Sequence, residues 1–161
     1  MIGPLFGRST SMIYKLTDKV WWGDKHAVAE VGNDIKSVLN VSQNQSERYF
    51  DRLKKLPQII PYFRLGRPDR EEMNRAYLQN LDAITDIIIK NGWYPCLVHC
   101  VAGGHRSPAA AVYLAWKISG KTKFALQALR TQMLTLKLDV AINRPYHRSL
   151  FQYCSDNSVN G

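Results

Sequence analysis

Segment 99–107 contains residue types that together could hold a phosphate group and attack it. It reads His-Cys-Val-Ala-Gly-Gly-His-Arg-Ser, between an apolar run at 95–98 and an alanine-rich run from Pro108 onward. The first run predicts a buried strand and the second a helix, with Pro108 tolerated only in the first turn. The first N–H groups of a helix lack internal partners, and the helix dipole adds positive charge there. The turn is therefore predicted to bind an anion.

Three side chains in this segment have predicted chemical roles. Cys100 is the predicted nucleophile, because helix N-termini and nearby cations favour the thiolate form of cysteine. The guanidinium of Arg106 is a planar fork of donors that fits two phosphate oxygens. The Ser107 hydroxyl is predicted to face the sulfur and to ease its departure when a covalent intermediate breaks down.

The backbone of the same turn is predicted to surround the anion. Gly103 and Gly104 allow the chain to curl inward, so that successive N–H groups form a concave nest. His99 is placed to orient the turn through hydrogen bonds. The predicted phosphate-binding residues are Val101, Ala102, Gly103, Gly104, His105 and Arg106.

The flanking pattern predicts an α/β domain with one central sheet. Strands are expected at 12–16, 20–22, 35–41, 59–65 and 95–98, and Pro61 indicates an edge or irregular position. Helices are expected at 25–31, at 108–116, at 123–133 and at 145–155. A long helix after Asp69 has apolar residues at three- and four-residue spacing and ends at Asn91-Gly92. Strands that alternate with helices favour an α/β fold.

The pattern His99-Cys100, five residues, Arg106-Ser107 resembles the signature of the protein tyrosine phosphatases, especially their dual-specificity subgroup. The early segment Trp22-Gly23 and the run Val-Leu-Asn-Val-Ser at 38–42 are also similar to that subgroup. The resemblance extends over about residues 12–153. It implies a mixed sheet of about five strands flanked by helices, with a strand, phosphate loop and helix forming the active site.

The resemblance also implies a general acid, an aspartate about thirty residues before the cysteine. Asp69 stands at that place, within Arg67-Pro68-Asp69. As a neutral acid it would protonate the leaving oxygen, and as a carboxylate it would activate water. A purely structural role, as a helix N-cap, is the alternative for Asp69. Asp82 and Asp86 fall inside the long helix and Asp51 lies too far upstream.

The implied activity is hydrolysis of phosphotyrosine and phosphoserine or phosphothreonine esters through a phosphocysteine intermediate, with no cofactor or metal. Partners are then a phosphorylated protein and inorganic phosphate or a similar oxyanion in the loop. Two alternatives stay open: the same chemistry on 5′-phosphorylated RNA, a phosphoinositide or a glucan phosphate, and a catalytically idle phosphate-binding module. His105 stands where a small residue is frequent in the family, which leaves the substrate class open.

Other interpretations of the reactive residues are weaker. A buried, inert role is the alternative for Cys100 and is favoured for Cys96 and Cys154. A zinc site formed by Cys96, His99, Cys100 and His105 has poor spacing. Three arginines and one histidine could form a basic rim around the pocket or simply a solvated face: Arg64, Arg67, Arg70 and His105.

The composition indicates the size of the domain, the charge of its partners and the compartment. The chain has 161 residues, 45% of them hydrophobic, which suits one globular domain with its own core. A net charge of +9 favours anionic partners and permits, without favouring, nucleic acid. Three cysteines and no secretory pattern or apolar span predict a cytoplasmic or nuclear protein with free thiols. The predicted division is an irregular arm at 1–11, a catalytic domain at 12–155 and a tail at 156–161.

Overall fold

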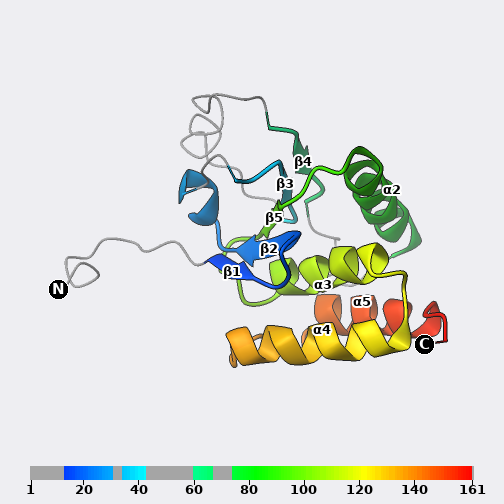
Figure 1. Ribbon diagram of the computed structural model, residues 1–161. Helices are drawn as coiled ribbons and strands as arrows, with labels where there is room; N and C mark the ends of the chain where they lie inside the picture. Colours follow the sequence, from blue (N-terminus) through cyan, green and yellow to red (C-terminus); the bar gives the residue numbers. More distant parts are fainter. Residues whose placement is uncertain (1–12, 31–33, 43–59, 67–73, 161) are drawn as a thin grey trace.

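The computed structural model describes residues 13–30, 34–42, 60–66 and 74–160. A five-stranded sheet forms their centre, with the strand order β1-β2-β5-β3-β4 (Figure 1). Strand β1 pairs antiparallel with β2, and the other neighbouring strands are parallel. The strands are β1 (Ile13–Lys15), β2 (Val20–Gly23), β3 (Ser37–Asn40), β4 (Tyr62–Arg64) and β5 (Cys96–His99). The predicted single mixed sheet flanked by helices is confirmed.

The central strands β3 and β5 are buried at every position, because both faces of the sheet are covered. Leu97 packs on one face in a small apolar cluster with Ala27 and Val28 of the 3-10 helix η2 (Ala27–Glu30). Val98, on the opposite face, belongs to the larger core beneath the helices. Strand β4 lies at an edge, and Pro61 immediately precedes it, in agreement with the edge position that this proline indicated.

Four helices complete the described fold: α2 (Arg75–Asn91), α3 (Arg106–Ile118), α4 (Lys123–Leu136) and α5 (Pro145–Asp156). Helix α3 is buried along most of its length, and its run of alanines lets it approach both the sheet and its neighbouring helices. Figure 1 shows α4 and α5 beyond α3, on the side away from the sheet. Helix α3 therefore lies between the sheet and the α4–α5 pair, and its first turn is fixed from both sides.

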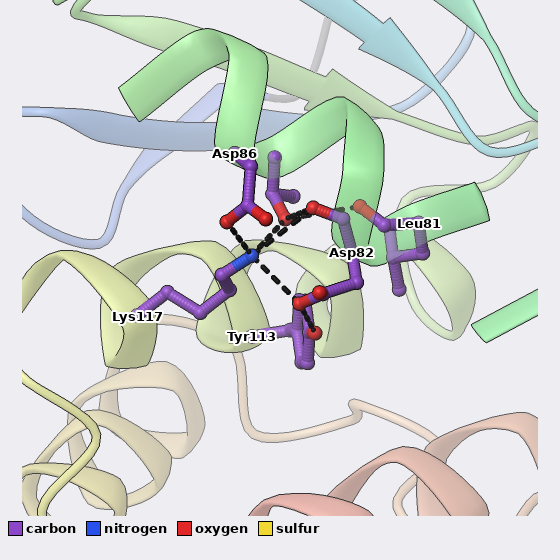
Figure 2. Close-up of polar contacts among 6 residues, drawn as sticks. Leu81, Asp82, Asp86, Tyr113 and Lys117 are labelled. Carbon is purple, nitrogen blue, oxygen red and sulfur yellow. Dashed lines mark hydrogen bonds and ion pairs between the residues drawn. The ribbon is translucent and has the colours of Figure 1, made fainter. Parts of the chain in front are cut away.

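Helix α2 is joined to α3 by a buried lysine (Figure 2). The ammonium of Lys117 is 3% exposed and donates to the carboxylates of Asp82 and Asp86 and to the hydroxyl of Thr85. Tyr113 donates from its hydroxyl to Asp82 as well. Charge-assisted bonds of this kind hold the register of two helices whose apolar faces alone would allow sliding.

Several predicted boundaries differ from the structure. The long helix begins at Arg75, where the side chain of Asn74 accepts a hydrogen bond from the Tyr77 N–H, so its N-cap is Asn74. The segment predicted as a helix at 25–31 is a single 3-10 turn, because the Asp24 carboxylate accepts the N–H groups of His26 and Ala27 in a local turn. Asp69 lies outside the described residues, as does Val31 at the end of the predicted helix 25–31.

The end of the described chain returns to the helical layer. Val159 pairs with Thr122 in an isolated parallel bridge, and the Trp116 indole donates to the Ser158 hydroxyl at 3.1 Å. Among the described residues, no helix combines the length and the apolar character needed to span a lipid bilayer. The division at residues 11 and 155 stays a prediction.

Candidate active site

The candidate site lies where β5 passes into α3, at the carboxyl end of the central strand. The parallel strands β2 and β3 flank β5, so loop 100–105 emerges from the middle of the sheet. Helix α3 begins at Arg106, and Pro108 occupies its first turn, as predicted. The N-cap residue His105 gives no side-chain cap to this helix. Its first N–H groups therefore remain directed toward the loop, where an anion can accept them.

The sulfur of Cys100 sits inside the loop. Its Sγ accepts the Gly103 N–H at 3.3 Å and lies 3.2 Å from the Ser107 hydroxyl. Cys100 is only 1% exposed, and it lines a pocket of about 610 Å³. The loop covers the side chain except where it borders this pocket, so a reactant would reach the sulfur from there.

The Ser107 hydroxyl has one proton and two neighbours. It donates to the Gly23 carbonyl at 2.9 Å while the Cys100 thiol donates to the hydroxyl oxygen. Once the sulfur is a thiolate, the same hydroxyl can rotate and donate to it, because Gly23 still accepts the Cys100 N–H at 3.3 Å. Ser107 is fully buried, so water does not compete for this bond.

Strand β2 and the chain after it support the loop from one side. The Trp22 indole N–H donates to the Gly103 carbonyl at 3.0 Å, and the Lys25 N–H donates to the Val101 carbonyl at 3.0 Å. Trp22 is fully buried, which fixes its indole. Both bonds tie loop carbonyls to β2 and the segment after it, while the Gly103 N–H is directed to the Cys100 sulfur.

Position 103 requires glycine for two reasons: its backbone conformation and the lack of space for a Cβ. Its φ is +77°, in the region that side chains disfavour. A Cβ at this position would lie 3.1 Å from the Asp24 backbone nitrogen and 3.2 Å from the Gly23 carbonyl carbon. Neither backbone atom can move without disturbing β2, so the loop comes this close to β2 only with glycine.

The connection between α4 and α5 supports the loop from the other side. The Ala141 N–H donates to the Gly104 carbonyl at 2.7 Å. This contact brings Lys137, Asp139 and Arg144 to the wall of the pocket. Lys137 forms a charged pair with Asp139. The Lys137 side chain is 10% exposed, whereas that of Asp139 is 81% exposed. The pocket therefore has two cations besides Arg106.

His99 belongs to a buried polar chain behind the loop. Burial lowers the pKa of His99 to about 4, although a contact with the Cys100 carbonyl acts in the opposite direction. The neutral ring approaches the Tyr62 hydroxyl at 3.5 Å, and Tyr62 accepts from the Asn40 amide at 3.1 Å. Asn40 in turn accepts the Ser42 N–H and hydroxyl. This chain links the last residues of β3 and β5 to Tyr62, the first residue of β4, and so fixes the His99 ring beside the loop.

The structure brings most of the predicted site residues together. Cys100 and five of the six predicted phosphate-binding residues line one pocket: Val101, Ala102, Gly104, His105 and Arg106. Gly103 contributes its amide behind the sulfur, and Ser107 lies beneath it. Asp69 is outside the described residues.

The predicted basic rim is only partly supported. Arg64 is exposed at the end of β4 and is not among the pocket-lining residues, whereas His105 is. Arg67 and Arg70 lie outside the described residues. The cations that sequence reasoning missed are Lys137 and Arg144, from a connection far along the chain. The short turn between α3 and α4 makes these helices antiparallel, so the end of α4 lies near the start of α3. The length of this turn is a sequence signal that could have placed Lys137 and Arg144 near the loop.

The zinc alternative has no support among the described residues. No three His, Cys, Asp or Glu side chains come together there in a way that could hold a metal ion. Burial raises the pKa of Cys96 to about 12, so its thiol is protonated in the core. All three cysteines are free and buried.

Comparisons with known proteins agree with this fold. No protein-family model and no curated protein sequence matches the chain. Solved structures do match: Tk-PTP in its active form has 14% identity and a TM-score of 0.66, covering 90% of this chain and 97% of that one. Human DUSP28 has 19% identity and a TM-score of 0.65, covering 89% and 93%. PTPMT1 in complex with PI(5)P has 14% identity and a TM-score of 0.62, covering 89% and 95%.

These similarities span nearly the full length of each chain, so they concern the whole domain rather than one motif. The chain therefore has the fold of the protein tyrosine phosphatases and dual-specificity phosphatases.

Proposed function

We propose that this chain is a cysteine-dependent phosphatase that hydrolyses phosphotyrosine and phosphoserine or phosphothreonine esters without a metal ion. The observation that carries the proposal is the position of Cys100 Sγ. It borders an open pocket at the N-terminus of α3, 3.3 Å from the Gly103 nitrogen and 3.2 Å from the Ser107 hydroxyl. The proposed nucleophile, the Gly103 N–H and the Arg106 guanidinium are thus close together at one strand-to-helix turn.

In the first half of the proposed reaction, the Cys100 thiolate attacks the phosphorus atom and a sulfur–phosphorus bond forms. The bond from phosphorus to the substrate oxygen breaks, and Asp69 gives its proton to that leaving oxygen. Arg106 and the loop amides hold the three remaining phosphoryl oxygens throughout. Phosphoryl transfer depends mainly on such positioning and charge placement.

In the second half, water attacks the phosphocysteine. The Asp69 carboxylate takes a proton from the water, the sulfur–phosphorus bond breaks, and inorganic phosphate and the thiolate are released. The Ser107 hydroxyl donates to the departing sulfur and stabilises its negative charge. The protein returns to its starting protonation state, so the cycle balances.

Removal of the nucleophile tests the proposal. With a chelator present, Cys100→Ser should reduce turnover of an aryl phosphate at least about 1,000-fold. The matched control is Cys154→Ala, a buried cysteine in α5 away from the pocket, which should keep the activity. Equal turnover by Cys100→Ser and the unmodified chain would overturn the proposal. Tight phosphopeptide binding without any turnover would instead favour an idle binding module.

The role of Asp69 has its own test. Asp69→Asn should slow hydrolysis of phosphoserine peptides, whose leaving oxygen needs a proton, much more than hydrolysis of p-nitrophenyl phosphate, whose leaving group does not. Asp86→Asn, on α2 at the contact with Lys117 and outside the residues that line the pocket, is the control and should change neither rate. Equal losses on both substrates would remove Asp69 from the acid role.

A second candidate is the same chemistry on a substrate with a further acidic group. The favouring observation is the pair Lys137 and Arg144, which line the pocket beside the loop. The pocket of about 610 Å³ leaves room beyond a single phosphate. PTPMT1, one of the matching structures, was solved with the phosphoinositide PI(5)P. A panel of phosphopeptides, phosphoinositides and 5′-triphosphorylated RNA under one metal-free condition would separate these classes.

A further inference from the structure

A second cavity lies between α4 and α5 and shares no lining residue with the pocket over Cys100. Its volume is about 290 Å³. It is lined by Leu126, Gln127, Arg130, Ile142, His147, Arg148, Phe151, Gln152 and Ser155. Two of these residues are arginines and none is an aspartate or glutamate. The potential inside the cavity is therefore positive, and an anion is the ligand it favours.

Two buried polar atoms in the lining have no hydrogen-bond partner among the described residues. They are Nε of Arg130 and Nε2 of His147, and His147 is only 1% exposed. A buried polar atom without a partner costs folding free energy, commonly about 1–3 kcal/mol. Two such atoms from facing helices, both lining one cavity, point to a ligand that would pair with them.

The aromatic ring of Phe151 holds both side chains in place. His147 stacks on it, with ring centroids 4.6 Å apart and an interplanar angle of 12°. The guanidinium of Arg130 lies 5.3 Å from the centroid of the same ring. Contact with an aromatic face fixes the position of a guanidinium without using its N–H donors. Those donors remain available, so little reorganisation would be needed on binding.

The charged groups around His147 favour a bound anion. Burial lowers the pKa of His147 to about 3, and the nearby His105 and Arg130 act in the same direction. Nothing negative in the lining offsets these neighbours. An oxyanion between Arg130 and His147 would supply the missing charge and accept from both helices.

We propose that the cavity between α4 and α5 is a second oxyanion site, in which Arg130, Arg148 and His147 bind the phosphate group of a small molecule. The two arginines favour a phosphate dianion over a carboxylate, because each can donate to a different pair of oxygens. The apolar wall of Leu126, Ile142 and Phe151 leaves space for a small body attached to the phosphate. The site is independent of the chemistry proposed at Cys100.

The test uses the full chain with ¹³C-labelled histidine, and the NMR signal of the His147 ring is followed during titration with inorganic phosphate. The titration is repeated with Arg106→Ala, which weakens binding at the catalytic loop. The His147 signal should shift and saturate in both proteins. A response that disappears with Arg106→Ala would show that it originates at the catalytic loop and would overturn the proposal, whatever the activity of that loop.

Arginine variants locate the site. Arg148→Gln should weaken phosphate binding at His147 at least about tenfold, the effect of losing one charge-assisted hydrogen bond of about 1.4 kcal/mol or more. Arg148 is exposed, so this change leaves the packing intact, whereas Arg130→Gln also removes the contact with Phe151. Lys123→Gln, exposed on α4 outside the lining, is the control and should bind as the unmodified chain does. Unchanged binding in both arginine variants would overturn the proposal.

A second probe identifies the source of the phosphate group. Phenylphosphonate carries the same oxyanion on an apolar ring and is not hydrolysed. Binding tighter than that of inorganic phosphate would assign the site to a phosphorylated molecule with an apolar body. Equal binding would assign it to inorganic phosphate itself. No saturable shift with either probe would rule the site out.

Discussion

The indole N–H of Trp22, on β2, donates to the carbonyl of Gly103 in loop 100–105 at 3.0 Å, and both residues are buried at this contact. The bond turns the Gly103 carbonyl away from the pocket, and the N–H of the same residue is directed to the Cys100 sulfur at 3.3 Å. One tryptophan therefore fixes the orientation of a peptide unit that the proposed chemistry depends on.

The variant Trp22→Phe tests this relationship. It removes the indole donor, leaves a buried carbonyl without that partner, and should reduce the free energy of unfolding by about 1–3 kcal/mol. Because the loop amides lose their fixed direction, vanadate affinity should fall as well. Trp116→Phe is the matched control: it loses a bond to Ser158 far from the loop, and vanadate affinity should stay unchanged. Equal vanadate affinity in both variants would contradict the role given to Trp22.

The two loop glycines should respond differently to alanine. Gly103→Ala forces a Cβ to 3.1 Å from the Asp24 backbone nitrogen at a positive φ, and should cost about 1–2 kcal/mol from the left-handed backbone alone. Gly104→Ala meets only the flexible Lys137 ammonium at 3.3 Å, which can move. Thermal unfolding and kcat/KM measured on both variants check this. Similar losses for the two would show that the clash with β2 is unimportant.

Ser107→Ala should slow the second half-reaction selectively. The buried hydroxyl lies 3.2 Å from Cys100 Sγ and can turn to donate to the thiolate, so its loss removes a stabilising bond from the departing sulfur. Stopped-flow assays with p-nitrophenyl phosphate should show a burst of nitrophenol followed by a steady rate reduced roughly tenfold or more. Ser107→Thr, which keeps the hydroxyl, should restore the steady rate. A burst-free loss equal in both half-reactions would contradict this assignment.

The two carboxylates that pair with the buried Lys117 should contribute unequally to the free energy of unfolding. Asp82 accepts from Lys117 and Tyr113, whereas Asp86 accepts from Lys117 alone and is 62% exposed. Asp82→Asn should therefore cost about 1–3 kcal/mol, the value of a hydrogen bond to a charged group, and Asp86→Asn less than about 1 kcal/mol. Urea unfolding measures both. The reverse order would contradict the geometry of Figure 2.

Acid should weaken the fold before the carboxylates titrate. Burial lowers the pKa of His99 to about 4, so the unfolded chain binds a proton at His99 below about pH 6.5 that the folded chain does not. The contribution of a neutral His99 is thus fully present above pH 6.5 and is lost as the pH falls toward 4. The slope amounts to about 1.4 kcal/mol per pH unit for each such group.

The variant His99→Gln, which does not titrate, checks this by urea unfolding at several pH values. Between about pH 6.5 and 4, the free energy of unfolding of this variant should fall less steeply with falling pH. The difference in slope should correspond to about one proton fewer taken up on unfolding, whatever the stability of the variant at pH 7. Identical slopes in the two proteins would show that His99 is not held neutral in the folded state.

The local features of the loop could be predicted from the sequence because Cys100, Arg106 and Ser107 fall within eight consecutive residues, 100–107. Cys100, Arg106 and Ser107 are spaced within one strand-to-helix turn, and apolar content on one side and alanines on the other predict the flanking elements. The dihedral preferences of glycine and the exposed amides of a first helical turn are local properties. Element ends were less predictable: the long helix starts at Arg75 because Asn74 caps it, a competition among nearby polar residues that periodicity does not resolve.

Local sequence patterns were thus enough to predict the loop after Cys100 and the strand and helix that flank it. The packing of distant elements, in contrast, brings Trp22 and Tyr62 against that loop, Lys137 and Arg144 to its pocket, and Arg130 and His147 to one cavity between α4 and α5. The reason is physical. Periodicity and propensity act over a few residues, whereas these contacts depend on which buried faces pack together, and α3, buried between the sheet and the helix pair, sets that arrangement for the whole domain.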